Sequence, residues 1–259
     1  MDEILSVKNQ LIKNLKKLHQ KKYRDREGKY LLEGFHLVEE ALLHQAKVEV
    51  ILVERRTYES HFEWFAKFDV KIVLVSEEVL KSVSELPTPQ GVLAVVCKKE
   101  EYPAQITGKW LLLDQVQDPG NVGTLIRTAD AAGFQGVFLG LGSADIYSTK
   151  VLRSMQGSNY HLPILSGELS HFIAQLKEND YAVYGTELSK EAVTYTSVPI
   201  QAKTAIILGN EGQGVQTEIL RLTKQNLYIP IYGKAESLNV GVAGGILMYH
   251  FVSADSLKK

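Results

Sequence analysis

The sequence predicts an α/β protein with two domains. Strand-like apolar runs alternate with helical segments along most of the 259 residues, which is the pattern of α/β folds. The alternation stops once, in a charged segment over residues 99–108 that contains Pro103 and ends in Gly108. Because 45% of the residues are hydrophobic, each half can bury a core of its own. We therefore expect one domain over 1–98, a linker over 99–108, and a second domain over 109–259.

The N-terminal domain is expected to begin with a basic helical arm over residues 1–29. Ser6 can cap a helix in which apolar residues recur at helical spacing, at Val7, Leu11, Leu15 and Leu18. Short apolar runs and amphipathic segments then alternate to the end of the domain. The runs predict strands at 30–32, 48–53, 70–75 and 91–96, and the amphipathic segments predict helices at 35–43, 58–68 and 77–83.

The C-terminal domain repeats this alternation with longer helical segments. Apolar runs predict strands at 110–113, 136–139, 161–164, 181–184, 205–208 and 227–231. Helices are expected at 122–132, 150–155, 170–178, 216–222 and 239–252. Regular alternation of this kind predicts a parallel sheet covered by helices.

Charge is distributed unevenly along the chain. The net charge is −1 overall, but residues 1–30 carry +5 and the remainder carries −6. A basic segment on an acidic protein suggests contact with a polyanion, and the alternative is an ordinary solvated helix face. The lysines that would make the contact are Lys13, Lys16, Lys17, Lys21 and Lys22.

Cysteine usage and hydropathy predict a cytoplasmic protein. The one cysteine, Cys97, ends an apolar run and cannot form a disulfide framework, which fits a reducing compartment. The N-terminus has no apolar leader, and no run approaches the 18 apolar residues that a membrane helix needs.

Three segments of the second half share one design, in which an apolar strand ends in a Gly/Asn/Pro turn and a helix follows. Residues 111–134 carry the turn Asp118–Asn121, in which Asn121 can cap the helix that follows, and Arg127 lies less than two helical turns further on. Residues 205–215 carry glycines at 209, 212 and 214 around Glu211. Each turn alone is ordinary in α/β proteins, and Asn121, Arg127 or Glu211 alone would be a helix cap, a surface charge or a loop carboxylate.

The third segment, residues 227–251, is the most informative. A strand-like run passes through a polar turn into a helix that opens with Ser237, Leu238 and Asn239. Gly241, Ala243, Gly244 and Gly245 follow, although each helical glycine costs about 1 kcal/mol relative to Ala. Ligands of open α/β sheets bind at the carboxyl ends of the strands, so the three turns can line one site.

Other chemistries lack their sequence patterns. The seven histidines show no zinc-binding spacing, and we expect no metal. The hydrolase elbow and the phosphate-binding P-loop are missing. The nearest approach to a dinucleotide-binding loop, at Gly140–Asp145, lacks its third glycine and makes a dehydrogenase a weak alternative.

The three turns contain Asn121-Val-Gly-Thr-Leu-Ile-Arg127, Leu208-Gly-Asn-Glu-Gly-Gln-Gly214, and Ile229-Pro230 with Ser237-Leu-Asn-Val240 and Ala243. In this order they resemble the signature motifs of the SpoU/TrmH family of RNA 2′-O-ribose methyltransferases, within the SPOUT class. The segments 30–34 and 88–92 resemble the L30e-like substrate-binding domain of many members. The resemblance covers nearly the whole chain.

This resemblance implies a fold and a cofactor. The C-terminal domain would be a SPOUT domain, a parallel sheet with helices on both faces and a deep trefoil knot that holds S-adenosylmethionine. The N-terminal domain would be a smaller α/β domain of the L30e type. The implied cofactor-binding residues are Thr186, Glu187, Leu208, Gly209, Asn210, Gly214, Ile229, Leu238, Asn239 and Ala243. Members are homodimers with the RNA site across the interface.

The implied chemistry is the attack of a ribose 2′-hydroxyl on the methyl group of the cofactor. Arg127 would be the essential catalytic residue. Because the pKa of guanidinium exceeds about 12, Arg127 is better suited to stabilise the developing alkoxide or clamp a phosphate as a cation than to act as a general base. The residues implied to orient Arg127 and the ribose are Asn121, Glu211, Ser237 and Asn239.

On the RNA side, Arg153 is implied as a phosphate contact. The neighbouring Gln156 stands where a small residue is expected. The extra N-terminal domain favours structured rRNA over tRNA as substrate. The alternatives are a tRNA 2′-O-methyltransferase, an RNA-binding or ribosome-assembly protein whose methylation is dispensable, and an enzyme that methylates a base nitrogen.

Overall fold

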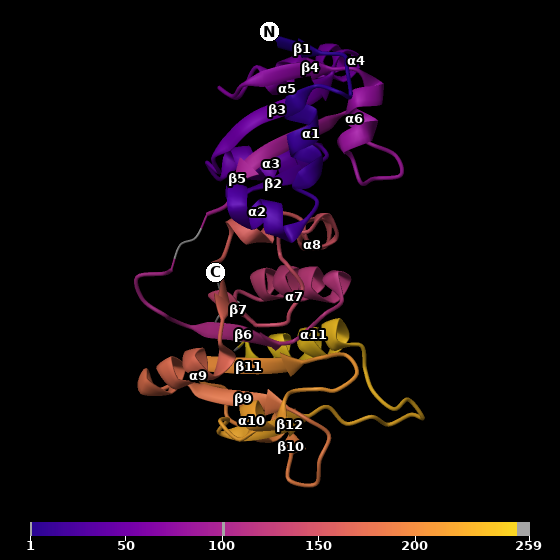
Figure 1. The fold of residues 1–259 in the computed structure, drawn as a ribbon. Coiled ribbons are helices and arrows are strands. Elements are labelled where there is room, and N and C mark those ends of the chain that lie inside the picture. The colour runs from indigo at the N-terminus through magenta and orange to yellow at the C-terminus, as the bar shows by residue number, and fades with distance from the viewer. Residues whose placement is uncertain (1, 100–101, 253–259) are drawn as a thin grey trace. The chain divides into compact units, whose positions relative to one another are not determined.

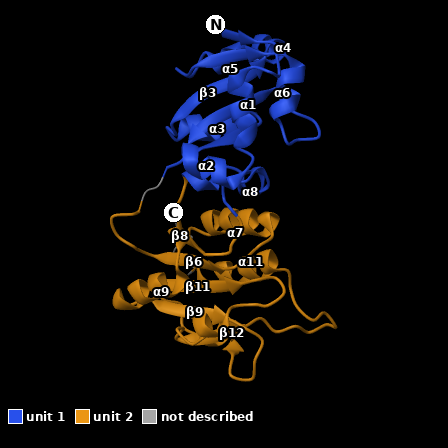
Figure 2. Ribbon diagram, in the orientation of Figure 1, with its two compact units in different colours: residues 1–100, 145–160 blue, residues 101–144, 161–259 orange. Residues whose placement is uncertain are grey.

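The computed structural model describes residues 2–99 and 102–252 and divides into two compact units (Figure 2). Unit 1 comprises residues 1–100 and 145–160, and unit 2 comprises residues 101–144 and 161–259. Sequence patterns predicted an uninterrupted second domain, and nothing in them marked residues 145–160 as part of the first unit. Residues 100 and 101 of the predicted linker, and residues 253–259 of the predicted second domain, lie outside the described residues.

Unit 1 is built on a mixed five-stranded sheet in the order β1-β4-β3-β5-β2 (Figure 1). Its first three strands are parallel, and β5 runs antiparallel to both of its neighbours. The strands are β1 (Asp2–Ile4), β2 (Lys29–Glu33), β3 (Val48–Glu54), β4 (Ile72–Val75) and β5 (Val92–Cys97). Because β1 pairs with β4, the N-terminal segment that was predicted as an arm begins as an edge strand of this sheet.

The helices of unit 1 mostly follow the predicted segments. They are α1 (Gln10–Lys17), α2 (Lys21–Glu27), α3 (Phe35–Leu43), α4 (Arg55–Ser60), α5 (Phe62–Phe65), α6 (Glu77–Val83) and α8 (Thr149–Met155), followed by a 3₁₀ turn (Ser158–Tyr160). The prediction of Ser6 as a helix cap was wrong, because Asn9 accepts from the Leu11 N–H at 2.8 Å and α1 starts after it. The predicted helix over 58–68 is broken at His61, whose φ of −124° is not helical.

Residues 145–160 are held to unit 1 by polar contacts as well as apolar ones. Arg24 is buried and donates to Asp145 at 2.6 Å and to the carbonyl of Leu18 at 2.8 Å. The hydroxyls of Tyr30 and Tyr160 lie 2.7 Å apart. A buried charge that lost its partner would cost several kcal/mol, so Arg24 fastens this segment rather than binding a ligand.

Unit 2 contains a seven-stranded sheet in which every pairing is parallel, in the order β10-β12-β9-β11-β6-β7-β8. The strands are β6 (Lys109–Asp114), β7 (Gly136–Gly140), β8 (Ile164–Gly167), β9 (Ala182–Thr186), β10 (Val193–Thr194), β11 (Thr204–Gly209) and β12 (Gln225–Tyr228). Strand β8 begins three residues later than predicted, and the prediction missed β1 and β10, which are too short to show a pattern.

Helices cover both faces of this sheet. They are α7 (Pro119–Ala131), α9 (Leu169–Glu178), α10 (Thr217–Leu220) and α11 (Val240–Phe251), with a 3₁₀ turn (Tyr195–Ser197) after β10. On one face Trp110 and Ile207 share a core with α9 and α10. On the other face α11 packs on α7 and β11, with the Gly244 Cα directly beside Leu125 and Leu208.

This sheet, with helices on both faces, confirms the α/β prediction, and the trefoil knot implied by the resemblance stays a prediction. Among the described residues, no helix is both long enough and apolar enough to cross a bilayer.

Candidate active site

The candidate site lies at the carboxyl ends of β6 and β11, which are adjacent and parallel at the centre of the sheet of unit 2. The chain leaves β6 towards β7 and β8 on one side and later builds β9, β11 and β12 on the other. Such a reversal of strand order opens a crevice between the loops that follow the two strands. The loops here are residues 115–118 and 210–216.

Glu211 joins the two loops. Its carboxylate accepts the backbone N–H groups of Gln117 at 3.2 Å and Asp118 at 3.1 Å. It also accepts the side-chain N–H of Asn121 at 3.0 Å. A loop carboxylate that receives three donors is fixed in place, so Glu211 is more than a solvated surface charge.

Asn121 links Glu211 to the third motif. The prediction of Asn121 as a helix cap was wrong, because Asp118 caps α7 and accepts the backbone N–H of Asn121 at 2.9 Å. The Asn121 side chain is therefore available to accept from the Asn239 amide at 3.0 Å. Asn239, in contrast, caps α11 and accepts the N–H of Gly241 at 2.9 Å. One hydrogen-bonded chain, Glu211–Asn121–Asn239, thus connects the three motifs.

The environment of Glu211 favours its charged form. Burial alone would raise the pKa of Glu211, but the hydrogen bonds from Asn121 and from the backbone N–H groups of Glu211, Asp118 and Gln117 lower it below its usual value. Glu211 is therefore an anion at neutral pH and a weak base. It can orient Asn121 or attract a cation, but it cannot donate a proton.

A cavity of about 520 Å³ lies beside this chain of hydrogen bonds. All ten residues predicted to hold the cofactor line it, and so do Glu211 and Ser237. One part of its wall is apolar, from Leu227, Ile229, Ile231 and Leu247, and another part is polar, from Thr186, Glu187 and Asn239. The size and mixed lining suit a ligand with one flat apolar group and several hydroxyl or charged groups.

The second motif forms a tight backbone hairpin at the edge of this cavity. Asn210 and Gly214 exchange backbone hydrogen bonds of 2.9 and 3.0 Å. A Cβ on Gly209 would lie 2.1 Å from the backbone carbon of Gly214, which cannot move aside as a side chain could. The Asn210 amide is occupied within the loops, since it donates to the Gln115 carbonyl at 2.9 Å and accepts from Gly212 at 3.0 Å.

Asn226 and Thr223, which sequence patterns did not indicate, hold the cavity-lining residue Glu187 in place. Asn226 donates to the Glu187 carboxylate at 2.7 Å, and the Thr223 hydroxyl donates to Asn226 at 2.7 Å. Thr186 donates its hydroxyl proton to the Ile207 carbonyl at 2.8 Å, so this proton is already used. No sequence signal marked Asn226, because its contact with Glu187 spans 39 residues.

Arg127 does not line the cavity in the single chain. It is exposed on α7, and among the described residues nothing forms an ion pair or hydrogen bond with its side chain. The neighbouring surface of α11 is apolar and exposed at Val242, Ile246 and Tyr249. An unpartnered arginine next to an exposed apolar helix face is typical of an interface residue.

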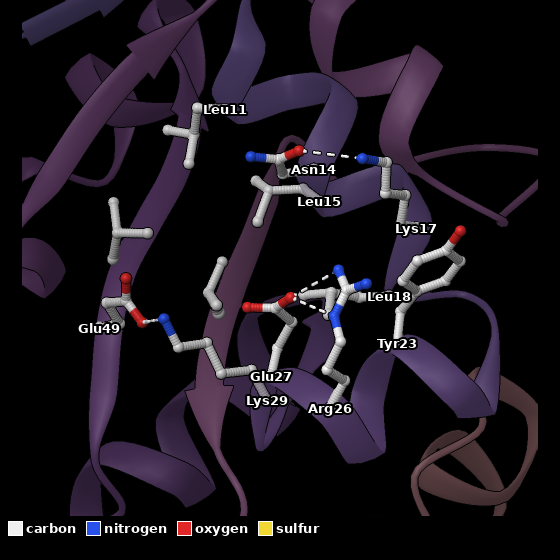
Figure 3. Close-up of a pocket in the computed structure, with 12 residues that line it drawn as sticks. Leu11, Asn14, Leu15, Lys17, Leu18, Tyr23, Arg26, Glu27, Lys29 and Glu49 are labelled. Atoms are coloured by element: carbon white, nitrogen blue, oxygen red, sulfur yellow. Dashed lines mark hydrogen bonds and ion pairs between the residues drawn. The ribbon is translucent and has the colours of Figure 1, made fainter.

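The predicted RNA-binding lysines lie on α1 and α2 of unit 1, and one of them, Lys17, lines a hollow of about 230 Å³ with Tyr23 and Arg26 (Figure 3). Three cations surround the ring of Tyr23 there, with Lys22 Nζ 4.9 Å, the Arg26 guanidinium carbon 4.9 Å and Lys17 Nζ 6.0 Å from its centre. Lys21 is paired with Asp25 at 2.6 Å. Lys13 and Lys16 have no ion pair among the residues that the structure describes. Arg153 is exposed on α8, also in unit 1.

Comparison with known proteins identifies both halves of the chain. Residues 109–249 match the SpoU rRNA methylase family, and residues 9–94 match the MRM3-like substrate-binding domain. A relative from Bacillus subtilis, the 23S rRNA (guanosine(2553)-2′-O)-methyltransferase RlmP, is 46% identical over 96% of this chain and 99% of its own length.

Solved structures agree with these matches. The AdoMet-bound rRNA methyltransferase from Sinorhizobium meliloti superposes with a TM-score of 0.86 at 29% identity, covering 96% of this chain and 97% of its own. A structure described as an RNA 2′-O ribose methyltransferase gives a TM-score of 0.82 at 30% identity, covering 96% and 97%. The chain therefore belongs to the SpoU rRNA methylase family, as the three sequence motifs predicted.

Proposed function

We propose that this chain transfers a methyl group from S-adenosylmethionine to a ribose 2′-hydroxyl of rRNA. The observation that carries the proposal is the hydrogen-bonded chain Glu211–Asn121–Asn239 beside the cavity of unit 2. This arrangement brings the three family motifs together at one edge of a parallel sheet, where α/β proteins bind their ligands.

The substrate we propose is a guanosine of 23S rRNA. The relative from Bacillus subtilis is named for that reaction, and its identity of 46% extends over nearly the whole of both chains. The match of residues 9–94 to a substrate-binding domain supports a large structured RNA over tRNA. The bacterial relative also supports a cytoplasmic location, because bacterial rRNA is made in the cytoplasm.

The residues of the cavity fit S-adenosylmethionine. Backbone groups of Gly209, Ile229 and Leu238 would hold the adenine, with apolar side chains against its faces. The Glu187 carboxylate, oriented by Asn226, would accept from the ribose hydroxyls through its other oxygen. Asn210 would act indirectly, by holding the loop, because its amide is already bonded to protein groups.

When bound, S-adenosylmethionine supplies a methyl group whose thioether leaving group needs no proton. The protein must therefore position the 2′-hydroxyl and stabilise the charge that develops on its oxygen. We assign the stabilisation to Arg127, because a guanidinium stays charged at neutral pH and forms strong bonds to oxyanions. Ser237 and Asn239, which line the cavity, would orient the ribose, and Glu211 would hold Asn121 and attract Arg127.

A homodimer would complete this site. The exposed Val242, Ile246 and Tyr249 of α11 support a contact with a second copy, since 53%, 36% and 56% of their surfaces are open to solvent in the single chain. Such a contact would bury Arg127 of each chain at the interface. The proposal includes a site to which both copies contribute, with Arg127 acting near the cavity of its partner.

The test is transfer of a labelled methyl group to 23S rRNA and to large ribosomal subunits from a strain that lacks this protein. After nuclease digestion, we expect the label in 2′-O-methylguanosine. Label in a methylated base would overturn the ribose assignment, and label only in tRNA would overturn the substrate. No transfer by a preparation that binds the cofactor would favour a ribosome-assembly protein.

A further inference from the structure

Unit 1 contains a second cavity, of about 430 Å³, which we call the α3–α8 pocket. Three segments that are far apart in the sequence line it: Gly34 and His36 at the start of α3, Thr88 and Gln90 before β5, and Arg153 and Gln156 at the end of α8. All three segments belong to unit 1. The pocket therefore unites the two segments that resemble a substrate-binding domain with the arginine implied as a phosphate contact.

One wall of the pocket is fixed by a buried carboxylate. Glu33 is only 7% exposed and accepts the backbone N–H of Glu85 at 3.0 Å and the hydroxyl of Ser84. These bonds hold the loop before β5 against the end of β2. Gly34 has a φ of +95°, and a Cβ there would lie 2.6 Å from the Gln90 side-chain oxygen, so the Gln90 amide lies directly on the Gly34 backbone.

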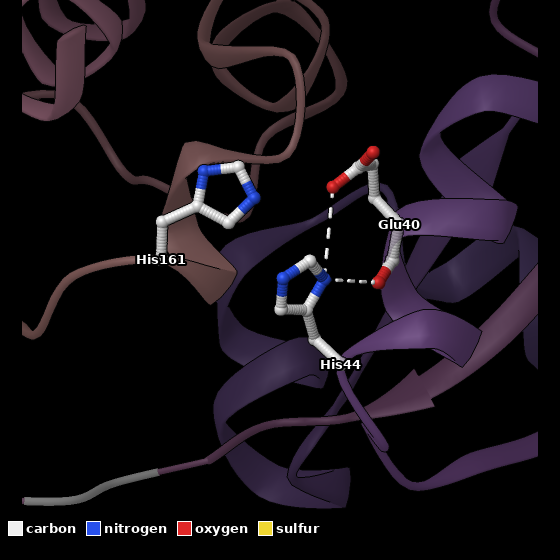
Figure 4. Close-up of side chains that lie close together, drawn as sticks. All are labelled: Glu40, His44 and His161. Carbon is white, nitrogen blue, oxygen red and sulfur yellow. Dashed lines mark hydrogen bonds and ion pairs between the residues drawn. The ribbon is translucent and has the colours of Figure 1, made fainter.

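The opposite wall is equally fixed. Helix α8 buries Val151, Leu152 and Met155, which leaves Arg153 exposed on its other side. The chain after α8 passes so close to α3 that a Cβ on Gly157 would lie 2.7 Å from Glu40 Cγ. At the C-terminal end of α3, the Nδ1 atom of His44 lies 3.0 Å from the carbonyl oxygen of this Glu40 and 3.6 Å from its carboxylate (Figure 4).

Two polar side chains of the lining, Glu33 and Gln156, bond within the protein, and the Gln156 amide donates to the Arg153 carbonyl, but four others are not used in this way by the part of the chain that the structure describes. Among the described residues, Arg153 forms no ion pair, and the side chains of His36, Thr88 and Gln90 form no hydrogen bond. The one acidic residue of the lining, Glu33, already accepts two hydrogen bonds. A preorganised cavity with one free guanidinium and several free amide, hydroxyl and imidazole groups matches a phosphate joined to a hydrogen-bonding ring.

We propose that the α3–α8 pocket binds one unpaired nucleotide of the RNA substrate, with its phosphate on Arg153 and its base edge at Gln90 and Thr88. The inference rests on the proposed function, since it takes rRNA as the substrate. Proteins read RNA sequence mainly at bases that are splayed out of the helix, and a glutamine amide can bond to the edge of such a base. Unit 1 would thus recognise a nucleotide other than the one that unit 2 methylates.

The test measures binding of a fluorescent 23S rRNA fragment that the wild-type protein methylates, over a series of salt concentrations. Arg153→Gln should weaken binding about tenfold and lower the salt slope by about 0.7–0.9, the effect of one lost phosphate contact. Arg153→Lys should keep the slope. The matched control is Arg56→Gln, because Arg56 is also exposed in unit 1, lies outside the pocket and has no ion pair among the described residues.

A second measurement tests recognition of the base. Fragments with single abasic sites should reveal one position where loss of the base weakens wild-type binding, and Gln90→Ala should reduce that penalty. For both variants, KM for RNA should rise while kcat and the affinity for S-adenosylhomocysteine stay unchanged. A purely structural role would instead lower all three together.

Two results would overturn the inference. One is wild-type affinity and salt slope in both Arg153→Gln and Gln90→Ala, tested on RNA that the wild-type protein methylates. The other is saturation of the pocket by a free mononucleotide that does not compete with the RNA fragment, which would indicate a small-molecule ligand. Failure of the wild-type protein to methylate any rRNA would count against the proposed function instead.

Discussion

The close approach beside the cavity of unit 2 is between backbone groups at the carboxyl end of a parallel strand, whereas the close approaches around the α3–α8 pocket of unit 1 are to side chains. In unit 2 the close approach at Gly209 is to the backbone of Gly214. In unit 1 the close approaches at Gly34 and Gly157 are to the side chains of Gln90 and Glu40. Backbone held in a hairpin cannot relax as a side chain can, so substitutions should have larger and more local effects in unit 2 than in unit 1.

The two sites also differ in what the single chain completes. Beside the cavity of unit 2, Glu211, Asn121 and Asn239 are already hydrogen-bonded to one another. Among the predicted catalytic residues, only Arg127 lies outside both that network and the lining of the cavity, whereas Arg153 of unit 1 lines its pocket. This difference predicts that unit 2 depends on a partner copy for chemistry and that unit 1 binds RNA by itself.

The largest expected effect is that of Arg127→Ala. Loss of a cation that stabilises the developing alkoxide should lower kcat by about 10²–10³. The affinity for S-adenosylhomocysteine, measured by calorimetry, should stay within about twofold, because Arg127 does not line the cavity. An Arg127→Ala enzyme with wild-type kcat would remove Arg127 from the reaction.

Gly209→Ala should be next in size. Its Cβ would meet the Gly214 backbone at 2.1 Å, and overpacking of this kind costs about 1–3 kcal/mol or more. We expect urea unfolding to show a loss at the upper end of that range and cofactor affinity to fall more than tenfold. Gly212→Ala in the same loop is the control, because its Cβ would meet nothing closer than 3.7 Å. Equal losses in the two variants would contradict the contrast between backbone and side-chain construction.

Substitutions of Asn239 separate its two roles. Asn239→Ala removes the cap of α11 and should cost about 1 kcal/mol of stability. Asn239→Asp keeps an acceptor for the Gly241 N–H but loses the donor to Asn121, so stability should be retained. Its kcat should fall about tenfold, the value of one lost hydrogen bond. Wild-type kcat in Asn239→Asp would show that the hydrogen-bonded chain is structural only.

The basic surface of unit 1 should show smaller effects, spread over several residues. Replacing Lys13, Lys16, Lys17, Lys21 and Lys22 by Gln, one at a time, should lower the salt slope of RNA binding by about 0.7–0.9 for each residue that contacts phosphate. Lys21 should contribute least, because Asp25 already neutralises it at 2.6 Å. Binding would be measured by fluorescence anisotropy. An unchanged slope in all five variants would mean that this surface is only a solvated helix face.

The smallest effects concern stability at extreme pH, and they too differ between the units. In unit 1 the ammonium groups of Lys21 and Lys98 lower the pKa of Asp25 to about 2. The small contribution of this exposed carboxylate to the free energy of unfolding is complete above its unfolded pKa of about 4 and is lost as the pH falls through about 2. Asp25→Asn should reduce the part of the acid-induced loss of stability that falls in this range.

In unit 2 burial raises the pKa of Tyr181 to about 12. The contribution of Tyr181 to the free energy of unfolding is complete below its unfolded pKa of about 10 and is lost as the pH rises through about 12. Tyr181→Phe should reduce the alkaline loss in urea unfolding and leave stability at pH 7 nearly unchanged, because the buried Tyr181 hydroxyl has no hydrogen-bond partner in the described part of the chain. An alkaline limb identical to that of the wild type would contradict this assignment.

Local sequence patterns predicted most elements, and their errors share one cause. Helices α3 and α6 have the predicted limits, because apolar periodicity and a clear start and end define them. Ser6 and Asn121 were both expected to cap helices, yet Asn9 and Asp118 do so. Several residues near a helix start can serve as its cap, and the surrounding structure decides which one is used.

The sequence by itself determined the α/β class, the family and the residues around the cavity of unit 2. Its motifs are contiguous, and the geometry of parallel strands brings their carboxyl ends to one edge of the sheet. Only the tertiary structure decided that Asn226 orients Glu187, that residues 145–160 belong to unit 1, and that Gly34, Gln90 and Arg153 meet in one pocket. These contacts join residues between 39 and 121 positions apart, such as Asn226 with Glu187 and Arg24 with Asp145. Local periodicity carries no information about such pairs, because long-range packing alone brings them together.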